Sequence, residues 1–330
     1  MSTEASFDWL KALPEPRSPS VFDAAQGLEH DAVRTALKER GFCILRNLVS
    51  KETVDAVSGL AEHYLAQPAI AGGPGYWKVD HPKVVLNAFV LGGPTLQVLL
   101  HPDVIEIIEG LMQSECILAD TMLKHDFSTR YDYFPIHSDF AEGWAKSANV
   151  KRKLTAEDMC EVVGVGGAFY LHDTDAGAFS YCDATHLLMS PKGQNLSAYS
   201  LQERAAMLDR KVRCVGQRGD LVLFDDRGFH GPDFPSSAER RVILMDYFRV
   251  DTIGRLQVTP MPIWSTDIAA LSPAQLRVAG AGADYMVHPT EHSRTRFRKS
   301  RLYPALAWLV KNAYLKDHIK NNIKSLLKRG

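Results

Sequence analysis

The chain lacks the cysteine patterns of a disulfide framework or a zinc site. Its five cysteines are widely spaced, odd in number and without a Cys-x-x-Cys pair, which favours free thiols in a reducing compartment. The first residues show neither the basic segment nor the apolar core of a secretory signal. No apolar run approaches the length of a membrane span. We therefore expect a cytoplasmic protein.

Two common metal motifs are absent as well. There is no His-x-His pair, as in cupin-type sites, and no His-Glu-x-x-His, as in zinc hydrolases. Internal repeats and low-complexity tracts are also missing. With 45% hydrophobic and 23% charged residues, the 330-residue chain has the composition of a globular protein, so it can bury a substantial core.

A net charge of −1 hides a strong asymmetry along the chain. Residues 292–330 contain eleven Lys and Arg against one acid, so this tail carries +10 and the remainder −11. Within the tail, an apolar stripe at helical spacing runs beside a row of lysines: Leu315, Ile319, Ile323 and Leu326 beside Lys316, Lys320, Lys324 and Lys328. Two interpretations stay open, a helix packed on the domain and a peripheral helix attracted to anionic lipid at the inner membrane face. No nucleic-acid partner is expected, because no recognised binding fold accompanies the basic tail.

Periodicity predicts helices first and short strands afterwards. Expected helices are 28–39, 53–65, 95–100, 104–112 and 201–208; expected strands are 41–46, 117–124, 131–137, 162–172, 177–182, 212–215, 220–224 and 241–250. Short strands with uneven loops indicate an antiparallel sandwich or jelly roll. We therefore expect a β-rich α+β protein: an extended arm over 1–27, a jelly-roll domain with N-terminal helices over 28–255, and a basic, partly helical extension over 256–330.

His137 and Asp139 are the first candidate metal ligands. They lie two residues apart where an expected strand leads into a turn, and side chains at that spacing on a strand lie on one face, so both can converge on one ion. The pair is weak evidence alone, since His101-Pro102-Asp103 is a second copy. That copy falls between two expected helices, where Asp103 suits a helix cap or first turn.

His230 follows 93 residues after His137, just beyond an expected strand. Two imidazoles and one carboxylate form the non-haem Fe(II) arrangement, which leaves coordination positions open. Eleven residues further, Arg241 opens a strand and offers a guanidinium for a bidentate carboxylate clamp. Its neighbour Arg240 is the alternative, because only one of them points inward; the register to Phe248 favours Arg241.

Taken together, these segments resemble the phytanoyl-CoA dioxygenase family of Fe(II)/2-oxoglutarate oxygenases. The resemblance covers residues 28–250 and rests on His137-Ser138-Asp139, the run 177–186, the run 219–231 and Arg241. It implies a double-stranded β-helix with His137, Asp139 and His230 as iron ligands. It further implies that Arg241 anchors 2-oxoglutarate, with Lys124 as a possible second contact.

The sequence departs from that family at three points. Asp183-Ala184-Thr185-His186 replaces a Pro-Gly-Ser/Thr-His turn, so His186 is expected to be structural, like His125 and His172. Pro232 cannot offer the hydroxyl that some members carry two residues after the second histidine. The two arginines, Arg240 and Arg241, leave the anchor open between them.

The resemblance implies a dioxygenase that uses O2 and 2-oxoglutarate and releases succinate and CO2. Related halogenases replace the carboxylate of the ligand set, so Asp139 favours hydroxylation, or another oxidation, over halogenation. The expected substrate is a small molecule or a lipid-linked compound that is oxidised at an unactivated C–H bond. The alternative is a member of the same fold that binds metal or ligand without turnover, as a structural or sensing protein.

Overall fold

The computed structural model describes residues 15–66, 76–78, 83–128, 135–141, 153–188, 192–233, 237–255 and 265–281, together with Leu10, Leu13 and Ile263. The predicted basic extension therefore lies outside the described residues, except for Ile263 and 265–281. The stripe of residues 315–326 lies outside them as well. The same holds for most of the predicted strand 131–137.

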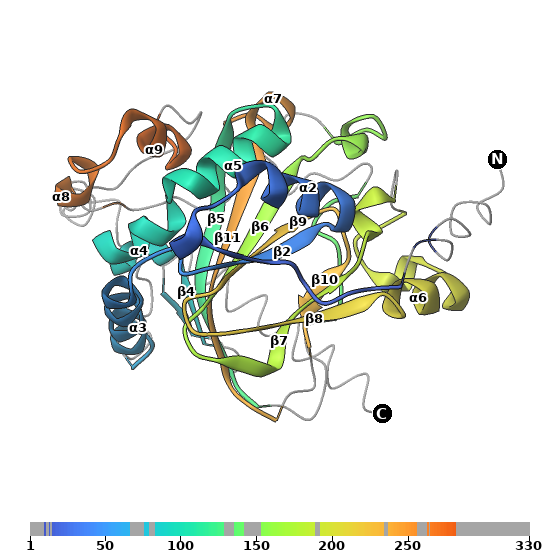
Figure 1. The fold of residues 1–330 in the computed structure, drawn as a ribbon, viewed down its shortest axis with the longest axis horizontal. Helices are drawn as coiled ribbons and strands as arrows, with labels where there is room; N and C mark the ends of the chain where they lie inside the picture. The colour runs from blue at the N-terminus through green and yellow to red at the C-terminus, as the bar shows by residue number, and fades with distance from the viewer. Residues whose placement is uncertain are drawn as a thin grey trace, which may run out of the picture.

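An eight-stranded sheet forms the centre of the molecule (Figure 1). Within the described residues, every pair of neighbouring strands in this sheet is antiparallel except the pair β1 and β2, which is parallel. In spatial order its strands are β1 (Val21–Asp23), β2 (Phe42–Arg46), β9 (Leu221–Asp225), β6 (Gly164–Tyr170), β11 (Arg240–Arg249), β5 (Cys116–Asp126), β4 (Lys83–Leu86) and β3 (Tyr76–Lys78).

A three-stranded sheet faces one side of the large sheet. It consists of β10 (His230–Pro232), β7 (Thr174–Cys182) and β8 (Lys211–Gly216), all antiparallel. Apolar side chains from both sheets meet in one buried cluster, among them Ile44 of β2, Val242 of β11 and Phe179 of β7. The space between the sheets is therefore the interior of a two-layer β-sandwich.

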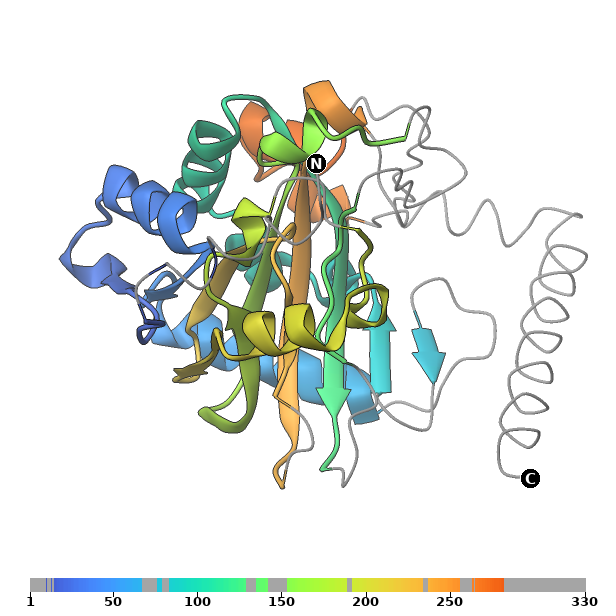
Figure 2. The ribbon, with the colours of Figure 1, turned by 90° about the vertical axis from the view of Figure 1, so that its right-hand side faces the viewer.

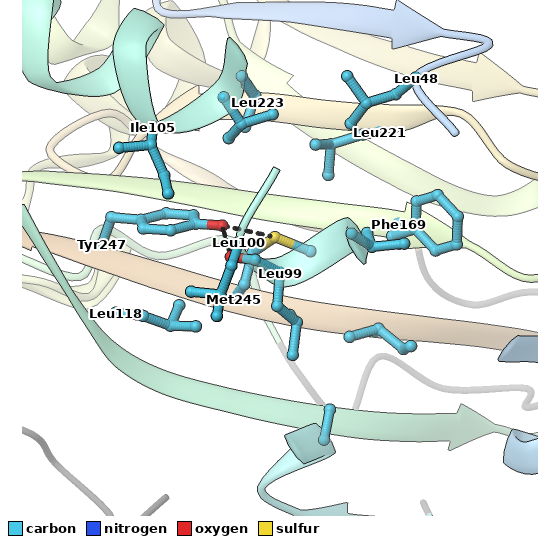
Figure 3. Close-up of a cluster of buried hydrophobic side chains, with 14 of the residues drawn as sticks. Leu48, Leu99, Leu100, Ile105, Leu118, Phe169, Leu221, Leu223, Met245 and Tyr247 are labelled. Atoms are coloured by element: carbon cyan, nitrogen blue, oxygen red, sulfur yellow. Dashed lines mark hydrogen bonds between the residues drawn. The ribbon is translucent and has the colours of Figure 1, made fainter. Parts of the chain in front are cut away.

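Helices cover the opposite face of the large sheet (Figures 1 and 2). They are α2 (His30–Arg40), α3 (Lys51–Ala66), α4 (Gly93–Leu99) and α5 (Pro102–Met112), followed late in the chain by α8 (Ser265–Ile268) and α9 (Pro273–Val278). The short helix α7 (Val250–Ile253) follows β11, and its Ile253 packs instead in a cluster with Phe140 and Phe248. The main core lies between these helices and the sheet. Figure 3 shows part of it, where the Tyr247 hydroxyl of β11 donates to the Leu99 carbonyl at 2.6 Å.

The helix termini explain why these segments end where they do. Gly41 adopts φ 88° and closes α2, a conformation that glycine takes without strain. The hydroxyl of Ser50 accepts a hydrogen bond from the Thr53 amide at 3.2 Å, which caps the start of α3. In α6 (Leu201–Leu208), Ser200 and Glu203 form a reciprocal capping box. Among the described residues, no helix is both long and apolar enough to cross a membrane.

The predicted helices and most predicted strands are confirmed, with ends that differ from the prediction by at most three residues. The mixed helix-and-sheet architecture is confirmed too. The short strands β1, β3, β4 and β10 were not predicted. Residues 21–23, placed in an extended arm by the sequence, form the edge strand β1 beside β2.

Candidate metal centre

The two segments that carry the histidines are joined through their backbones. The His137 amide donates to the His230 carbonyl at 2.9 Å, and the His230 amide donates to the His137 carbonyl at 2.7 Å. The Asp139 amide donates to the Asp226 carbonyl at 3.0 Å, just before β10. The pairing therefore brings together residues that lie 93 positions apart in the sequence.

The three predicted ligands converge. The Nε2 atom of His137 lies 3.6 Å from Asp139 Oδ1, and the Nε2 atom of His230 lies 3.5 Å from Asp139 Oδ2. One ligand atom from each residue lies within 4.8 Å of the others. Donors that share an ion at about 2.0–2.2 Å lie roughly 3–3.5 Å apart, so these side chains have nearly the spacing of a metal site.

Hydrogen bonds hold both imidazoles in the tautomer that a metal requires. The Nδ1–H group of His137 donates to the Pro135 carbonyl at 3.0 Å, and that of His230 donates to the Gly228 carbonyl at 2.9 Å. A carbonyl only accepts, so Nδ1 carries a proton in both rings and Nε2, the nitrogen that faces Asp139, is the atom left to bind a metal. The residues present therefore fit a divalent cation.

The local electrostatics also suit a cation. Burial alone would lower the pKa of His137, but its hydrogen bond with Asp139 and the charge of that carboxylate outweigh burial and raise the pKa. The His230 side chain is only 5% exposed. Its ring packs against Phe224 and Phe179, with centroid distances of 4.5 and 5.6 Å, so an apolar wall limits the access of water on that side.

A segment that the sequence analysis missed supports the turn between the ligands. The Ser138 amide donates to the Gln194 carbonyl at 2.8 Å, and Gln194 Nε2 donates to the Asp139 carbonyl at 2.5 Å. Asn195 forms a bridge with His137. The Ser138 hydroxyl, fully buried, donates to the Phe140 carbonyl at 2.7 Å. No motif marks Gln194, because its role depends entirely on the folded chain.

Two further carboxylates lie beside Asp139. Asp226 and Asp246 each offer an oxygen within 4.8 Å of an Asp139 oxygen. Gly164 and Gly166 of β6 leave room for the Asp226 carboxylate, since a Cβ atom at either position would overlap it. The sequence analysis missed both acids; the only signal is that Asp226 lies between a predicted strand and His230.

The two arginines of β11 face in the directions opposite to the prediction. Arg240 is 2% exposed, whereas the side chain of Arg241 is 34% exposed and its Nη1 binds Glu62 Oε1 of α3 at 2.7 Å. Val242 and Phe248 lie in the clusters inside the sandwich, on the same side as Arg240, because an even number of residues separates them. Arg241 is seven residues before Phe248, so it lies on the helix-covered face.

Lys124 lies in the sandwich interior, as a contact near the metal centre must. Its side chain is buried, and its Nζ lies 3.2 Å from Asp126 Oδ1 on the same strand. Asp126 pairs directly across the strands with Arg240, whose Nε donates to it at 2.9 Å. Lys124 pairs across the strands with Val242, which lies in the same buried cluster as the Phe179 and Phe224 rings that pack against His230.

Four histidines outside the candidate ligand set have structural partners. His101 precedes α5 and Asp103 lies in its first turn, which confirms the predicted helix junction. The Nε2–H group of His186 donates to the Lys38 carbonyl at 2.9 Å, and that of His172 donates to the Glu239 carbonyl at 3.0 Å. His125 binds the Glu239 carboxylate at 2.9 Å. These contacts agree with the structural roles expected for His125, His172 and His186.

No family model and no curated protein sequence matches this chain. Solved structures do match it. EctD from S. alaskensis with bound Fe is similar with a TM-score of 0.54 at 16% identity, over 77% of this chain and 85% of that chain. The non-heme alpha ketoglutarate dependent carbocyclase SnoK from nogalamycin biosynthesis gives 0.51 at 18% identity, over 79% and 95%. The epimerase SnoN, in complex with Fe3+, alpha ketoglutarate and nogalamycin RO, gives 0.51 at 15% identity, over 67% and 84%. The chain therefore has the fold of these iron- or alpha-ketoglutarate-binding enzymes.

Proposed function

We propose that the protein is an Fe(II)- and 2-oxoglutarate-dependent dioxygenase. The observation that carries the proposal is the convergence of His137, Asp139 and His230, with both Nε2 atoms directed at the carboxylate. Two imidazoles and one carboxylate are the ligand set of non-haem Fe(II) oxygenases. Similarity of fold to iron- or alpha-ketoglutarate-binding enzymes supports the same class.

The roles of the residues follow from their chemistry. His137, Asp139 and His230 would hold the iron, which supplies oxidising power when it is bound with 2-oxoglutarate and O2. Arg240, supported by Lys124, is the proposed anchor for the distal carboxylate of 2-oxoglutarate, because both cations are buried in the sandwich interior. A buried guanidinium binds a carboxylate through two parallel hydrogen bonds, which orients it as well as holding it.

The proposed reaction is the oxidation of an unactivated C–H bond of a small molecule or lipid-linked substrate. The aromatic wall of Phe179 and Phe224 beside His230 supports such chemistry, because it shields the reaction centre from water. Asp139 supports oxygenation or a related oxidation over halogenation, since it occupies the position that a halide would need. We further propose that the chain is a distant member of the phytanoyl-CoA dioxygenase group.

The test measures metal binding and turnover together. Wild-type protein, loaded anaerobically with Fe(II), should bind 2-oxoglutarate and, with O2, form succinate. His137→Ala removes one ligand, so we expect the affinity for Fe(II) to fall at least about tenfold and succinate formation to be lost. His172→Ala is the matched control, because within the described part of the chain the His172 ring bonds to the backbone of Glu239 and Arg241.

Each result of this test decides between function classes. Tight binding of Fe(II) and 2-oxoglutarate without succinate, across a panel of substrates, would favour a sensing or structural protein of the same fold. Turnover that is equal in wild type and His137→Ala would overturn the proposed ligand set. If His137→Ala and His172→Ala lose turnover equally, the loss reflects a general effect of substitution on the protein and does not support His137 as a ligand.

A further inference from the structure

Asp126 is a fully buried carboxylate to which the proposed reaction assigns no role. It lies at the end of β5, the direct neighbour of β11 in the sheet (Figure 1). Its side chain is 0% exposed, and it lies on the same face of the strand as Lys124. It therefore lies in the sandwich interior together with the two cations that are proposed to bind 2-oxoglutarate.

One carboxylate holds both cations. Asp126 Oδ2 accepts from Arg240 Nε at 2.9 Å and from Arg240 Nη2 at 2.5 Å, and Oδ1 lies 3.2 Å from Lys124 Nζ. The contacts use the Nε–Nη2 edge of the guanidinium, so the Nη1 side of Arg240 points away from Asp126. Each oxygen of Asp126 thus fixes one cation.

Burying three charged side chains is unfavourable for the stability of the fold. Replacing a buried ion pair by apolar residues of similar size is often neutral or stabilising, so stability alone does not explain three ionised groups at this place. Lys124 pairs directly across the strands with Val242, which belongs to the same buried cluster as Phe179 and Phe224. The rings of Phe179 and Phe224 pack against His230, so the ion cluster lies in the part of the sandwich interior that also holds a proposed iron ligand.

We propose that Asp126 is a positioning residue that directs Arg240 and Lys124 toward the distal carboxylate of 2-oxoglutarate. The inference rests on the function proposed above. Asp126 fixes the guanidinium through a two-donor contact and fixes the ammonium group from the other oxygen. The cosubstrate then meets two donors whose orientation is already set before it binds.

The charge of Asp126 has a second effect, on the protonation of Lys124. Burial, and to a lesser extent the charge of Arg240, lowers the pKa of Lys124, while Asp126 raises it. An amide at position 126 would remove that support, so Lys124 would lose its proton more easily. The orientation of Arg240 and the charge of Lys124 would therefore change together.

The test compares two metal-chelating anions on the metal-loaded protein. Binding of 2-oxoglutarate, and of oxalate, which chelates a metal but has no distal carboxylate, is measured by anaerobic calorimetry with Fe(II)-loaded full-length protein. For Asp126→Asn we expect the affinity for 2-oxoglutarate to be about 10- to 100-fold weaker. This is the effect of losing one charge-assisted hydrogen bond between the cosubstrate and a cation that is no longer correctly oriented. The oxalate affinity should stay within about twofold. Arg240→Gln should show the same pattern, and Arg241→Gln, on the helix-covered face, should bind both anions like wild type.

The outcomes separate this inference from the proposed function. If wild type binds oxalate and 2-oxoglutarate equally well, or binds neither, the proposed function itself fails. If wild type prefers 2-oxoglutarate and Asp126→Asn keeps that preference, only the role of Asp126 is overturned, and an equal loss for both anions overturns it too. Should Asp126→Asn not fold, Asp126→Glu replaces it: a smaller loss confined to 2-oxoglutarate supports the role, and an unchanged preference overturns it.

Discussion

His186 is a buried imidazole whose charged form the fold disfavours. It is buried, its Nε2–H donates to the Lys38 carbonyl, and within the part of the chain that the structure describes no hydrogen-bond partner reaches its Nδ1. Burial therefore lowers the pKa of His186. A proton on Nδ1 would place an unsatisfied charge in the core.

This burial predicts a dependence of stability on pH. The unfolded chain binds a proton at His186 near its ordinary pKa of 6.5, whereas the folded chain does so only at lower pH. Stability is therefore full above about pH 6.5 and falls below it, by up to about 1.4 kcal/mol per pH unit. Urea unfolding of wild type and His186→Gln between about pH 7.5 and 5 measures this, and the variant should show the shallower slope. Equal slopes would contradict the assignment.

The two arginines of β11 mark a limit of sequence-based prediction. Alternation along a strand states only that Arg240 and Arg241 face opposite ways, not which face is the interior. Counting from Phe248 resolves it, since Phe248 lies inside the sandwich and Arg240 is an even number of residues away. A correct prediction required knowing which face of β11 the helices cover. The sequence of β11 does not give this, because it depends on how the helices pack on the sheet.

At the scale of the element, two glycines provide contrasting tests. A Cβ atom on Gly59 of α3 would have no other atom within 4 Å, whereas a Cβ atom on Gly166 of β6 would overlap the Phe224 ring and the Asp226 carboxylate. Gly59→Ala should stabilise the protein by up to about 1 kcal/mol, because alanine favours the helix. Gly166→Ala should cost about 1–3 kcal/mol through overpacking.

Thermal unfolding and Fe(II) titration check both variants. Gly166→Ala should also weaken Fe(II) binding, because the Asp226 carbonyl accepts the Asp139 amide. Gly59→Ala should leave it unchanged. Stabilisation by Gly166→Ala would show that β6 has more space than the structure indicates.

Elements with local signals were predictable, and those without were not. The caps at Ser50 and Ser200 and the apolar spacing of α5 lie within the segments themselves. By contrast, β1 and β10 have three residues each, and they are strands only because β2 and β7 pair with them. Long-range pairing of this kind leaves no periodicity in the sequence.

At the scale of the whole molecule, the cysteines give an accessible test of the core. All five are free thiols, as predicted, and only Cys160 is exposed. Burial raises the pKa of Cys43 and of Cys182 to about 12, and it raises the pKa of Cys116 and Cys214 as well. We expect one thiol to react rapidly with a disulfide reagent in the native protein and five in denaturant. Cys160→Ser should abolish the rapid reaction; a second rapid thiol would contradict the burial.

The candidate site as a whole was predictable in its donors but not in its surroundings. The spacing of His137 and Asp139 and the place of His230 after a strand, taken together with the resemblance to a known family, identified the three side chains that converge. Gln194, Asp226 and Asp246 carry no motif, because their positions depend on how distant segments meet. The same holds for Asp126, whose partner Arg240 lies on another strand.

The reciprocal backbone bridge between His137 and His230 also bears on folding kinetics. It closes a loop of 93 residues, so the complete donor set exists only after the sandwich has closed. An ion bound there would stabilise the native state but not the earlier transition state. Loading the protein with metal should therefore slow unfolding and leave the refolding rate almost unchanged.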